Sequence, residues 1–262
     1  RHYASVLSQA FGVRRGDQVP SHEIWAARIA IVALVAMVVI ISVVTGLAWS
    51  LTILFVLLTL VMFISMARLF VELGLYNIYA WWFPITVIFG IFGFAALGPR
   101  QLVIVGVLSQ VVMVFPAVTM IAMAANAMRI SESAKVAPRR ISPWMVTVFL
   151  LALVVGVFCT MYVQYNWGVP TPGWSGMKAA TAPYDFVQQN LQTFVGSREG
   201  WQSLRWEHIR PNTEFLWSVG AGIALVLVVS ILRLRYTWWP LHPLVFLVWG
   251  IWPLAVLGFS FF

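Results

Sequence analysis

Residues 29–44 decide the fold of this chain: they read IAIVALVAMVVIISVV, and Ser42 is their one polar side chain. The stretch belongs to an apolar run from Trp25 to Ala48, which is long enough for the roughly 20 residues that one bilayer crossing requires. A helix that is apolar all round is buried or spans a membrane, because it offers no polar face to water. We therefore predict that this segment crosses a membrane as a helix.

The composition extends this prediction to the whole chain. Of 262 residues, 61% are hydrophobic and 9% are charged, whereas a soluble domain has about 25% charged residues. So few charges cannot cover a water-facing surface. The 14 tryptophans and 7 tyrosines suit the boundary between membrane and water, where rings with a polar tip gather. We predict an all-α, polytopic integral membrane protein.

Apolar segments recur along the chain, and we expect about seven transmembrane helices. In chain order these are about Trp25–Ala48, Leu51–Phe70, Ala80–Leu97, Gln101–Met128, Pro143–Val163, Phe215–Leu232 and a last one from Pro243 onward. Trp49 and Ser50 alone separate the first two, which predicts a tight helical hairpin. Pro84 fits the first turn of the third helix. Pro116 should kink or break the fourth.

The lysines and arginines orient the chain. With the N-terminus in the cytoplasm, most of the 16 lie in cytoplasmic segments: Arg1, Arg14, Arg15, Arg28, Arg68, Arg129, Lys135, Arg139, Arg140, Arg233 and Arg235. The others lie outside: Arg100, Lys178, Arg198, Arg205 and Arg210. All of these except Arg100 belong to one long loop, where charge has little effect on topology. Because short basic loops stay in the cytoplasm, we predict a cytoplasmic N-terminus.

This orientation divides the chain into four parts. They are a cytoplasmic segment (residues 1–24), a five-helix membrane segment (25–163), an extracytoplasmic Trp-rich loop (164–214) and a two-helix membrane segment (215–262). In the loop, Pro183 is placed to start a helix with Phe186, Asn190 and Phe194 on one face, lying on the membrane surface or capping the bundle. The last segment ends inside an apolar stretch. We expect a truncated piece of a longer chain, whose helices belong to a larger bundle.

The sequence lacks the residue patterns that several kinds of chemistry require. Cys159 is the single cysteine, so no internal disulfide can form, and no Cys/His cluster is present to hold a metal. No catalytic triad, zinc-protease, P-loop or dinucleotide pattern occurs. The net charge of +8 is accounted for by cytoplasmic loops. We therefore expect no enzyme activity, no metal site and no nucleic acid binding, and the sequence leaves any cofactor undefined.

One pair of charged residues is a candidate functional group, because an ionisable side chain is costly inside a membrane. Glu72 is the one acidic candidate, and it follows Arg68 by four residues, so the two share a helix face. One interpretation is a group that couples transport to protons or substrate. The other is an interfacial ion pair that ends the helix before Gly74.

The fourth predicted span carries the remaining candidates: Ser109, Gln110, Pro116, Thr119 and Asn126. Transporters place binding sites where a membrane helix is interrupted and its backbone groups are freed. Polar side chains in membrane helices also simply bond to a neighbouring helix, so both interpretations stay open. The predicted pathway for a substrate or ion consists of Glu72, Arg68, Gln110, Pro116 and Asn126.

The segment between the sixth and seventh spans carries a motif that is more specific to one family than hydrophobicity alone. Residues 232–244 read LRLRYTWWPLHPL, a basic loop with an aromatic anchor and two prolines that set a rigid turn. It resembles the LRxRxxWWPLHPLG signature of a family of large bacterial membrane proteins of unknown function, which has been likened to the oligopeptide transporter superfamily. The matching positions in this motif turn are Arg233, Arg235, Trp238, Trp239, Pro240, His242 and Pro243, and Val245 replaces the final glycine.

Two further stretches are similar to that family, in its order. Residues 68–75, RLFVELGL, resemble its RxRAEAGLP segment, and residues 161–168, MYVQYNWG, resemble its aromatic span end before an external loop. The resemblance implies a transporter-like, polytopic fold in the bacterial inner membrane. Members of the family are longer chains with more helices, and the fourth span here lacks the acidic, amphipathic character expected from them.

These features support two hypotheses. The first is a transporter-like protein for a small organic solute or peptide, with ion coupling through Arg68 and Glu72. The second is a non-catalytic structural or accessory subunit of a larger membrane complex, because the spans are nearly all apolar and the Trp-rich loop offers a docking surface. The expected partners are the lipid bilayer and either other membrane subunits or the rest of a longer chain.

Overall fold

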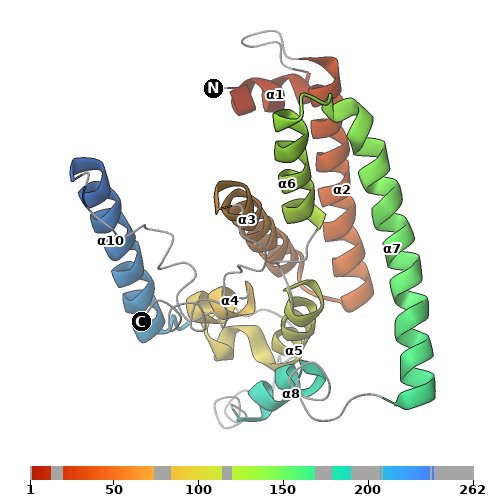
Figure 1. Cartoon of the computed structure of the whole chain (residues 1–262). Coiled ribbons are helices and arrows are strands. Elements are labelled where there is room, and N and C mark those ends of the chain that lie inside the picture. Colours follow the sequence, from red (N-terminus) through yellow and green to blue (C-terminus); the bar gives the residue numbers. More distant parts are fainter. Residues whose placement is uncertain are drawn as a thin grey trace, which may run out of the picture. The chain divides into compact units, whose positions relative to one another are not determined.

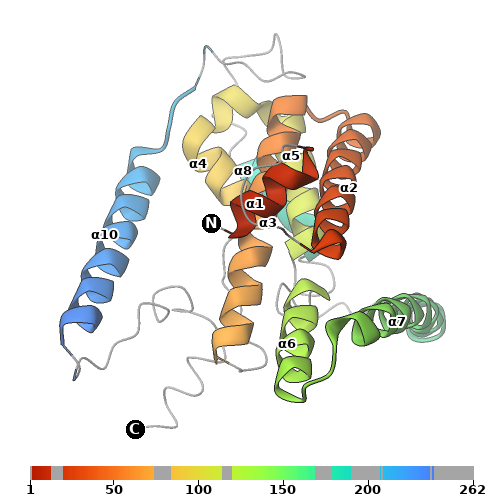
Figure 2. The same cartoon turned by 90° about the horizontal axis from the view of Figure 1, so that it is seen from above.

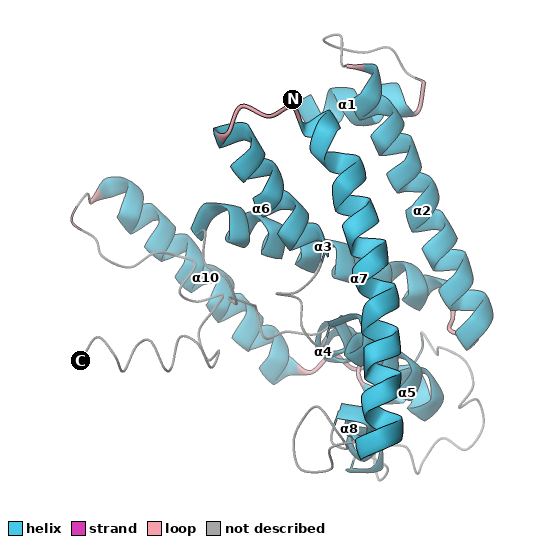
Figure 3. Cartoon of the chain, turned by 45° about the vertical axis from the view of Figure 1, so that its right-hand side comes forward, coloured by secondary structure: helices cyan, strands magenta, loops and turns pink. Residues whose placement is uncertain are grey.

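The computed structural model describes residues 2–12, 20–73, 84–113, 120–168, 179–189, 207, 209–236 and 238. Within these ranges the regular structure is helical, and no strand occurs (Figure 3). In chain order the helices are α1 (His2–Ala10), α2 (Ser21–Thr45), α3 (Trp49–Leu73), α4 (Pro84–Phe92), α5 (Phe94–Met113), α6 (Met120–Ser133), α7 (Pro138–Trp167), α8 (Ala179–Gln189) and α10 (Thr213–Arg235). The all-α prediction is confirmed.

Five of the described helices are long and apolar enough to cross a membrane: Ser21–Thr45, Trp49–Arg68, Phe94–Val112, Arg140–Trp167 and Thr213–Arg235. In α7, 0% of the most apolar window is buried within the chain. Surface of this kind is covered by lipid, because water offers it no favourable contact. The chain is therefore a helical membrane protein.

The chain divides into two compact units, Arg1–Leu57 and Leu58–Phe262, and α3 runs through the boundary. In the first unit, α1 packs against α2, and Arg28 Nε donates a hydrogen bond of 3.1 Å to the Ala10 carbonyl oxygen. The guanidinium of Arg28 also lies 5.4 Å from the ring centre of Trp25. These contacts tie the first helix to the start of the first apolar span.

The turn between α2 and α3 is as short as predicted, but it lies a little earlier in the chain. It comprises Gly46–Ala48, and α3 already begins at Trp49. Gly46 has φ 68°, and its amide donates to the Ser42 carbonyl. The Ser42 hydroxyl donates to the Leu47 carbonyl at 3.0 Å. The single polar side chain of the 29–44 stretch thus closes the turn, by satisfying a carbonyl outside the helix.

The predicted third span, Ala80–Leu97, is wrong as a continuous helix. The nine-residue helix α4 ends at Phe92, where Gly93 (φ 77°) interrupts the backbone, and α5 starts at Phe94. A second kink lies at Gly98 (φ 69°, ψ 161°), a conformation suited to glycine and followed by Pro99, which disfavours helix in the residue before it. At 1.5 Å per residue, α4 is about 14 Å long, well short of a bilayer core of about 30 Å.

The structure describes two parts of the predicted fourth span, Gln101–Met128. Its first half belongs to α5, which ends at Met113, and its second half to α6, which begins at Met120. Pro116 lies between them, outside the described residues. Of the two helices, α5 is a candidate membrane span, and α6 is a 14-residue helix joined to α7 by a short turn (Figure 2).

The fifth and sixth predicted spans are confirmed and extended. They correspond to α7 and α10, which begin and end a few residues beyond the predicted limits. The side chain of Asn212 caps α10 by accepting a 3.2 Å hydrogen bond from the Phe215 amide. Arg233 and Arg235 lie exposed in its last turn, where the negative end of the helix dipole stabilises cations. The seventh predicted span lies outside the described residues.

Of the motif turn, the structure describes only the beginning. Trp238 is exposed, and its ring lies 6.2 Å from that of Tyr236. Trp239, Pro240, His242 and Pro243 lie outside the described residues.

The loop helix α8 starts four residues before the predicted position. Pro183 lies inside it rather than at its start, and Asn190 and Phe194 are outside the described residues. The helix packs against α5 (Figure 1); its position on the membrane surface or as a cap of the bundle stays a prediction. Because Val187 is 7% exposed, one face of α8 is buried in this contact.

Replacing Gly93 should destabilise the second unit strongly. A Cβ at this position would collide with the Arg210 carbonyl oxygen, and the φ of 77° strains any L side chain. We expect Gly93→Ala to lower the free energy of unfolding by about 2 kcal/mol. The measurement is unfolding of the purified protein in detergent, followed by tryptophan fluorescence.

Gly156→Ala in α7 is the matched control. Among the described residues, nothing lies within 4 Å of a Cβ built there, so alanine should leave stability unchanged or raise it by up to about 1 kcal/mol. Equal unfolding midpoints for the two variants would contradict the proposed break at Gly93.

Candidate functional site

A cavity of about 210 Å³ lies between α4, α5 and α8. Its walls are mostly apolar or aromatic, and none of the described residues that line it is charged. The lining residues are Ile85, Thr86 and Phe89 from α4, Gly106, Ser109 and Gln110 from α5, and Ala182, Pro183 and Phe186 from α8. Concave, largely apolar sites with a few polar groups are the usual form of a small-molecule site.

Two polar atoms at this cavity lack a hydrogen-bond partner among the described protein groups: the Ser109 hydroxyl oxygen and Gln110 Oε1. Ser109 is 1% exposed. A buried polar atom without a partner costs about 1–3 kcal/mol, so native structures keep few of them. A ligand that hydrogen-bonds to both atoms would remove this cost.

Four phenylalanines hold the walls of the cavity together. The ring centroid of Phe89 lies 5.4 Å from that of Phe94, 5.6 Å from Phe186 and 6.3 Å from Phe215. Phe94 and Phe186 are 5.5 Å apart. Aromatic pairs at such distances stabilise by about 0.5–1.5 kcal/mol beyond their buried area. The cluster therefore joins α4, α5, α8 and α10 at one point.

The break after α4 is closed by the chain that leads into α10. The Phe92 carbonyl accepts a hydrogen bond of 3.2 Å from the Arg210 amide, and the Gly90 carbonyl accepts one of 3.0 Å from the Asn212 amide. The last carbonyls of a helix have no partner within it, so these bonds satisfy groups that would otherwise be exposed. The α4 wall of the cavity is thereby fixed in place.

The predicted pathway residues do not all meet at this cavity. Gln110 lines it, whereas Arg68 is exposed in α3 and Asn126 is half-buried in α6. The side chain of Glu72, in the last turn of α3, lies outside the described residues, as does Pro116. Gln110 thus lines a pocket, and a pathway role for the five residues, the Arg68–Glu72 hypothesis included, stays a prediction.

Most of the cavity lining was missed by sequence reasoning. Thr86 and Phe89 carry no distinctive pattern in an apolar stretch, and they reach the site only because α4 folds back at Gly93. Phe186 was predicted only as part of a helix face in the loop, from its spacing, and not as a site residue. The signal that could have located the others is the glycine at 93, which divides a predicted span that is otherwise continuous.

The apolar spans, the interrupted helix and the capped cavity define the class of this protein as a helical membrane protein. The chain belongs to a family of unknown function, DUF6785, whose model matches residues 1–262. No curated protein and no solved structure matches the chain.

Apolar replacement of Gln110 should stabilise the protein. Gln110→Leu removes the unpartnered Oε1 and keeps a similar volume, so the free energy of unfolding should rise by about 1 kcal/mol. The measurement is the unfolding midpoint in detergent without added solute. A lower midpoint would mean that Gln110 has a partner on which the fold depends.

Thr59→Val is the matched variant outside the cavity. Thr59 lies in α3, is 2% exposed, and its hydroxyl also lacks a partner among the described residues. The same relief of an unpaired group should raise stability by about 1 kcal/mol. Because Thr59 does not line the cavity, the pair separates stability from ligand binding.

Proposed function

We propose that this protein transports a small, uncharged organic solute across the membrane, and that the solute binds in the cavity between α4, α5 and α8. The observation that carries the proposal is the pair of atoms at this pocket, Ser109 Oγ and Gln110 Oε1, that have no partner among the described residues. The proposal includes no catalytic step.

The interrupted helix supports transport over a purely structural role. Non-helical backbone within a membrane protein is tolerated where it is buried in protein or lines a cavity, and transporters bind substrate at discontinuous helices. Here α4 ends after nine residues, and its residues Thr86 and Phe89 line the cavity. The resemblance to a family likened to oligopeptide transporters points the same way.

The cavity also constrains the solute. A volume of about 210 Å³ is below the roughly 300–1,000 Å³ of sites for drug-sized ligands, which favours a small solute over a peptide. Since an amide oxygen can only accept, Gln110 Oε1 requires a hydrogen-bond donor on the solute. None of the described lining residues is charged, which disfavours an ion, because a buried charge needs a partner.

The helix α8 closes one side of this cavity and would have to move for solute to enter or leave. Its contact with α5 includes Pro183, since a Cβ built on Gly106 would lie 2.9 Å from the Pro183 Cβ. The charge distribution predicts that α8 belongs to an extracytoplasmic loop and that the N-terminus is cytoplasmic. On this orientation, α8 would control access from outside the cell.

The direct test is a binding screen followed by uptake. Purified protein is melted with a panel of small neutral solutes, small ions and dipeptides, and a solute that binds only the folded state raises the midpoint. The solute with the largest shift is then measured for uptake into proteoliposomes. We expect a neutral hydrogen-bond donor, and at least about tenfold weaker binding by Gln110→Leu, which loses one hydrogen bond.

Thr59→Val controls for the change in stability, since its binding and uptake should equal those of the wild type. If Gln110→Leu bound and carried the solute as well as Thr59→Val does, the cavity would not be the transport site.

Coupling to an ion is the finer part of the proposal and depends on Glu72. As the one acidic candidate, at the cytoplasmic end of the second predicted helix, Glu72 would carry a proton through its carboxylate. We expect Glu72→Gln to abolish uptake driven by a proton gradient while leaving counterflow exchange of the solute intact. Unchanged gradient-driven uptake would exclude Glu72 as the coupling group.

A second function, as an accessory subunit of a larger complex, is favoured by one observation. The apolar windows of α2 and α10 are each only 6% buried, and that of α7 is 0% buried within the chain. Helices of a complete bundle normally pack against neighbours. Extraction in mild detergent distinguishes the two roles, because an accessory subunit would co-purify with other membrane proteins and give no solute-dependent shift in the melting midpoint.

A further inference from the structure

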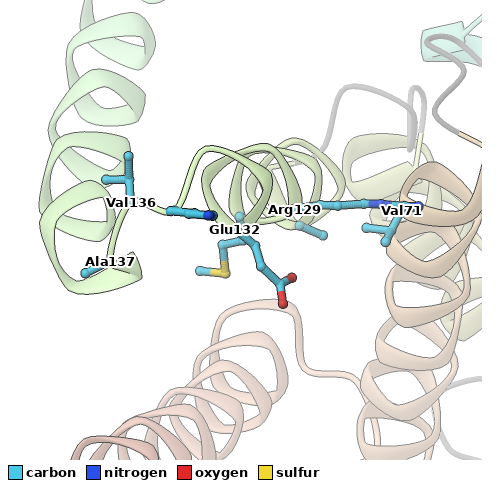
Figure 4. A pocket seen from close by; sticks show the side chains of 8 residues that line it. Val71, Arg129, Glu132, Val136 and Ala137 are labelled. Carbon is cyan, nitrogen blue, oxygen red and sulfur yellow. The ribbon is translucent and has the colours of Figure 1, made fainter.

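A second and larger pocket, of about 810 Å³, lies where the end of α3 meets the turn between α6 and α7. It is lined by Val71 of α3, by Arg129 and Glu132 of α6, and by Lys135 and Ala137 in the turn, among others. In Figure 4 the side chain of Arg129 extends from α6 toward Val71, whereas the carboxylate of Glu132 points to another side of the helix. The cationic group of Arg129 is thus available to a ligand in the pocket.

The position of this pocket in the chain places it at the membrane boundary. The candidate span in α3 ends at Arg68, and the candidate span in α7 begins at Arg140. The pocket is formed by the residues just beyond these two ends, at 71 and 125–137. This is the depth at which lipid headgroups lie, since they flank the hydrocarbon core.

The local backbone favours an anion. The last carbonyls of α6 carry partial negative charge, but two of them are already bonded. The amide of Lys135 donates to the Glu132 carbonyl at 3.0 Å, and that of Val136 donates to the Ser131 carbonyl at 2.9 Å. On the other side of the turn, the N-cap of α7 is Ala137, whose side chain cannot cap the helix. The positive end of a 30-residue helix dipole therefore faces the same turn.

The side chains add two cations and one acid. Arg129, Lys135 and Glu132 are all exposed at the pocket, which gives its lining a net positive charge. A guanidinium binds phosphate oxygens through two parallel hydrogen bonds, and a lysine supplies a point charge beside it. Lys135 is held at φ 56°, so its position is set by the backbone of the turn.

We propose that this pocket binds an organic phosphate with net negative charge, with Arg129 and Lys135 as its ligands. Basic pockets between membrane helices bind phosphate-bearing headgroups, and the span ends place this one at headgroup depth. The source of the phosphate is therefore an anionic phospholipid, and a free phosphate ester is the alternative source with the same chemistry.

The test measures binding of three probes to the purified full chain in neutral detergent: dioctanoyl phosphatidylglycerol, dioctanoyl phosphatidylcholine and glycerol 1-phosphate. We expect phosphatidylglycerol to bind at least about tenfold more tightly than phosphatidylcholine, because the choline cation cancels the phosphate charge. Weak binding of glycerol 1-phosphate supports the lipid as the source. Equally tight binding supports the free ester and the same pocket chemistry.

Two variants move the affinity in opposite directions. Arg129→Gln combined with Lys135→Asn should weaken phosphatidylglycerol binding about thirtyfold, and asparagine tolerates the left-handed backbone at 135. Glu132→Gln removes the acid that the described lining contains and should tighten binding about fivefold. A tighter complex cannot result from misfolding, so this variant keeps the test valid even if the double variant is unstable.

Arg140→Gln combined with Arg235→Gln is the control for net charge. Both arginines are exposed, and neither lines the pocket. Their removal lowers the charge of the chain by the same amount and should leave binding within about twofold of the wild type. Equal binding of phosphatidylglycerol and phosphatidylcholine, or equal losses in the double variant and this control, would overturn the proposal.

Discussion

A helix that ends among apolar side chains leaves its last carbonyl groups without partners, and such groups are expensive to bury. In this protein the constraint acts at the end of α4, where Gly93 turns the chain and the amides of Arg210 and Asn212 bond the carbonyls of Phe92 and Gly90. Two segments more than a hundred residues apart in the sequence are therefore held together. The start of α10 and the α4 wall of the cavity depend on this closure.

The cavity follows from the same break. Because α4 ends after nine residues, its aromatic face meets α5 and α8 rather than continuing through a bilayer, and Phe89 joins Phe94, Phe186 and Phe215 in one cluster. The cluster closes the walls but leaves Ser109 and Gln110 with polar atoms that no described protein group bonds. A largely apolar pocket with polar atoms that no described group bonds is an arrangement that suits a ligand.

The two pockets of the second unit suit different ligands for physical reasons. Around Ser109 and Gln110 none of the described lining residues is charged, and hydrogen bonding to a neutral solute is the interaction that they offer. Around Arg129 and Lys135 the side chains are exposed and cationic, at the ends of two candidate spans. A charged ligand would keep much of its solvation at these exposed residues. Inside the apolar cavity it would lose that solvation, which raises the free energy of binding.

Much of the helix content could be predicted from sequence. The aliphatic run at residues 29–44 can satisfy its backbone only as a helix in lipid, and α7 and α10 follow from the same reasoning, so these spans agree with the structure within a few residues. The predictions were less accurate where a glycine interrupts a helix. Gly93 and Gly98 lie in a stretch that is apolar throughout, and hydropathy cannot distinguish a continuous helix from an interrupted one.

The candidate site was predictable only in part. Ser109 and Gln110 stand out because polar side chains are costly within an apolar helix, and Phe186 stands out by its spacing in the loop. The sequence by itself thus determined that α2, α3, α7 and α10 are helices suited to a membrane, through local hydrophobicity and the need to satisfy backbone groups. The tertiary structure alone decided that α4 folds back, that α8 covers α5, and that Thr86, Phe89 and Phe186 meet Gln110, because these contacts join residues far apart in the chain and depend on packing that no local pattern records.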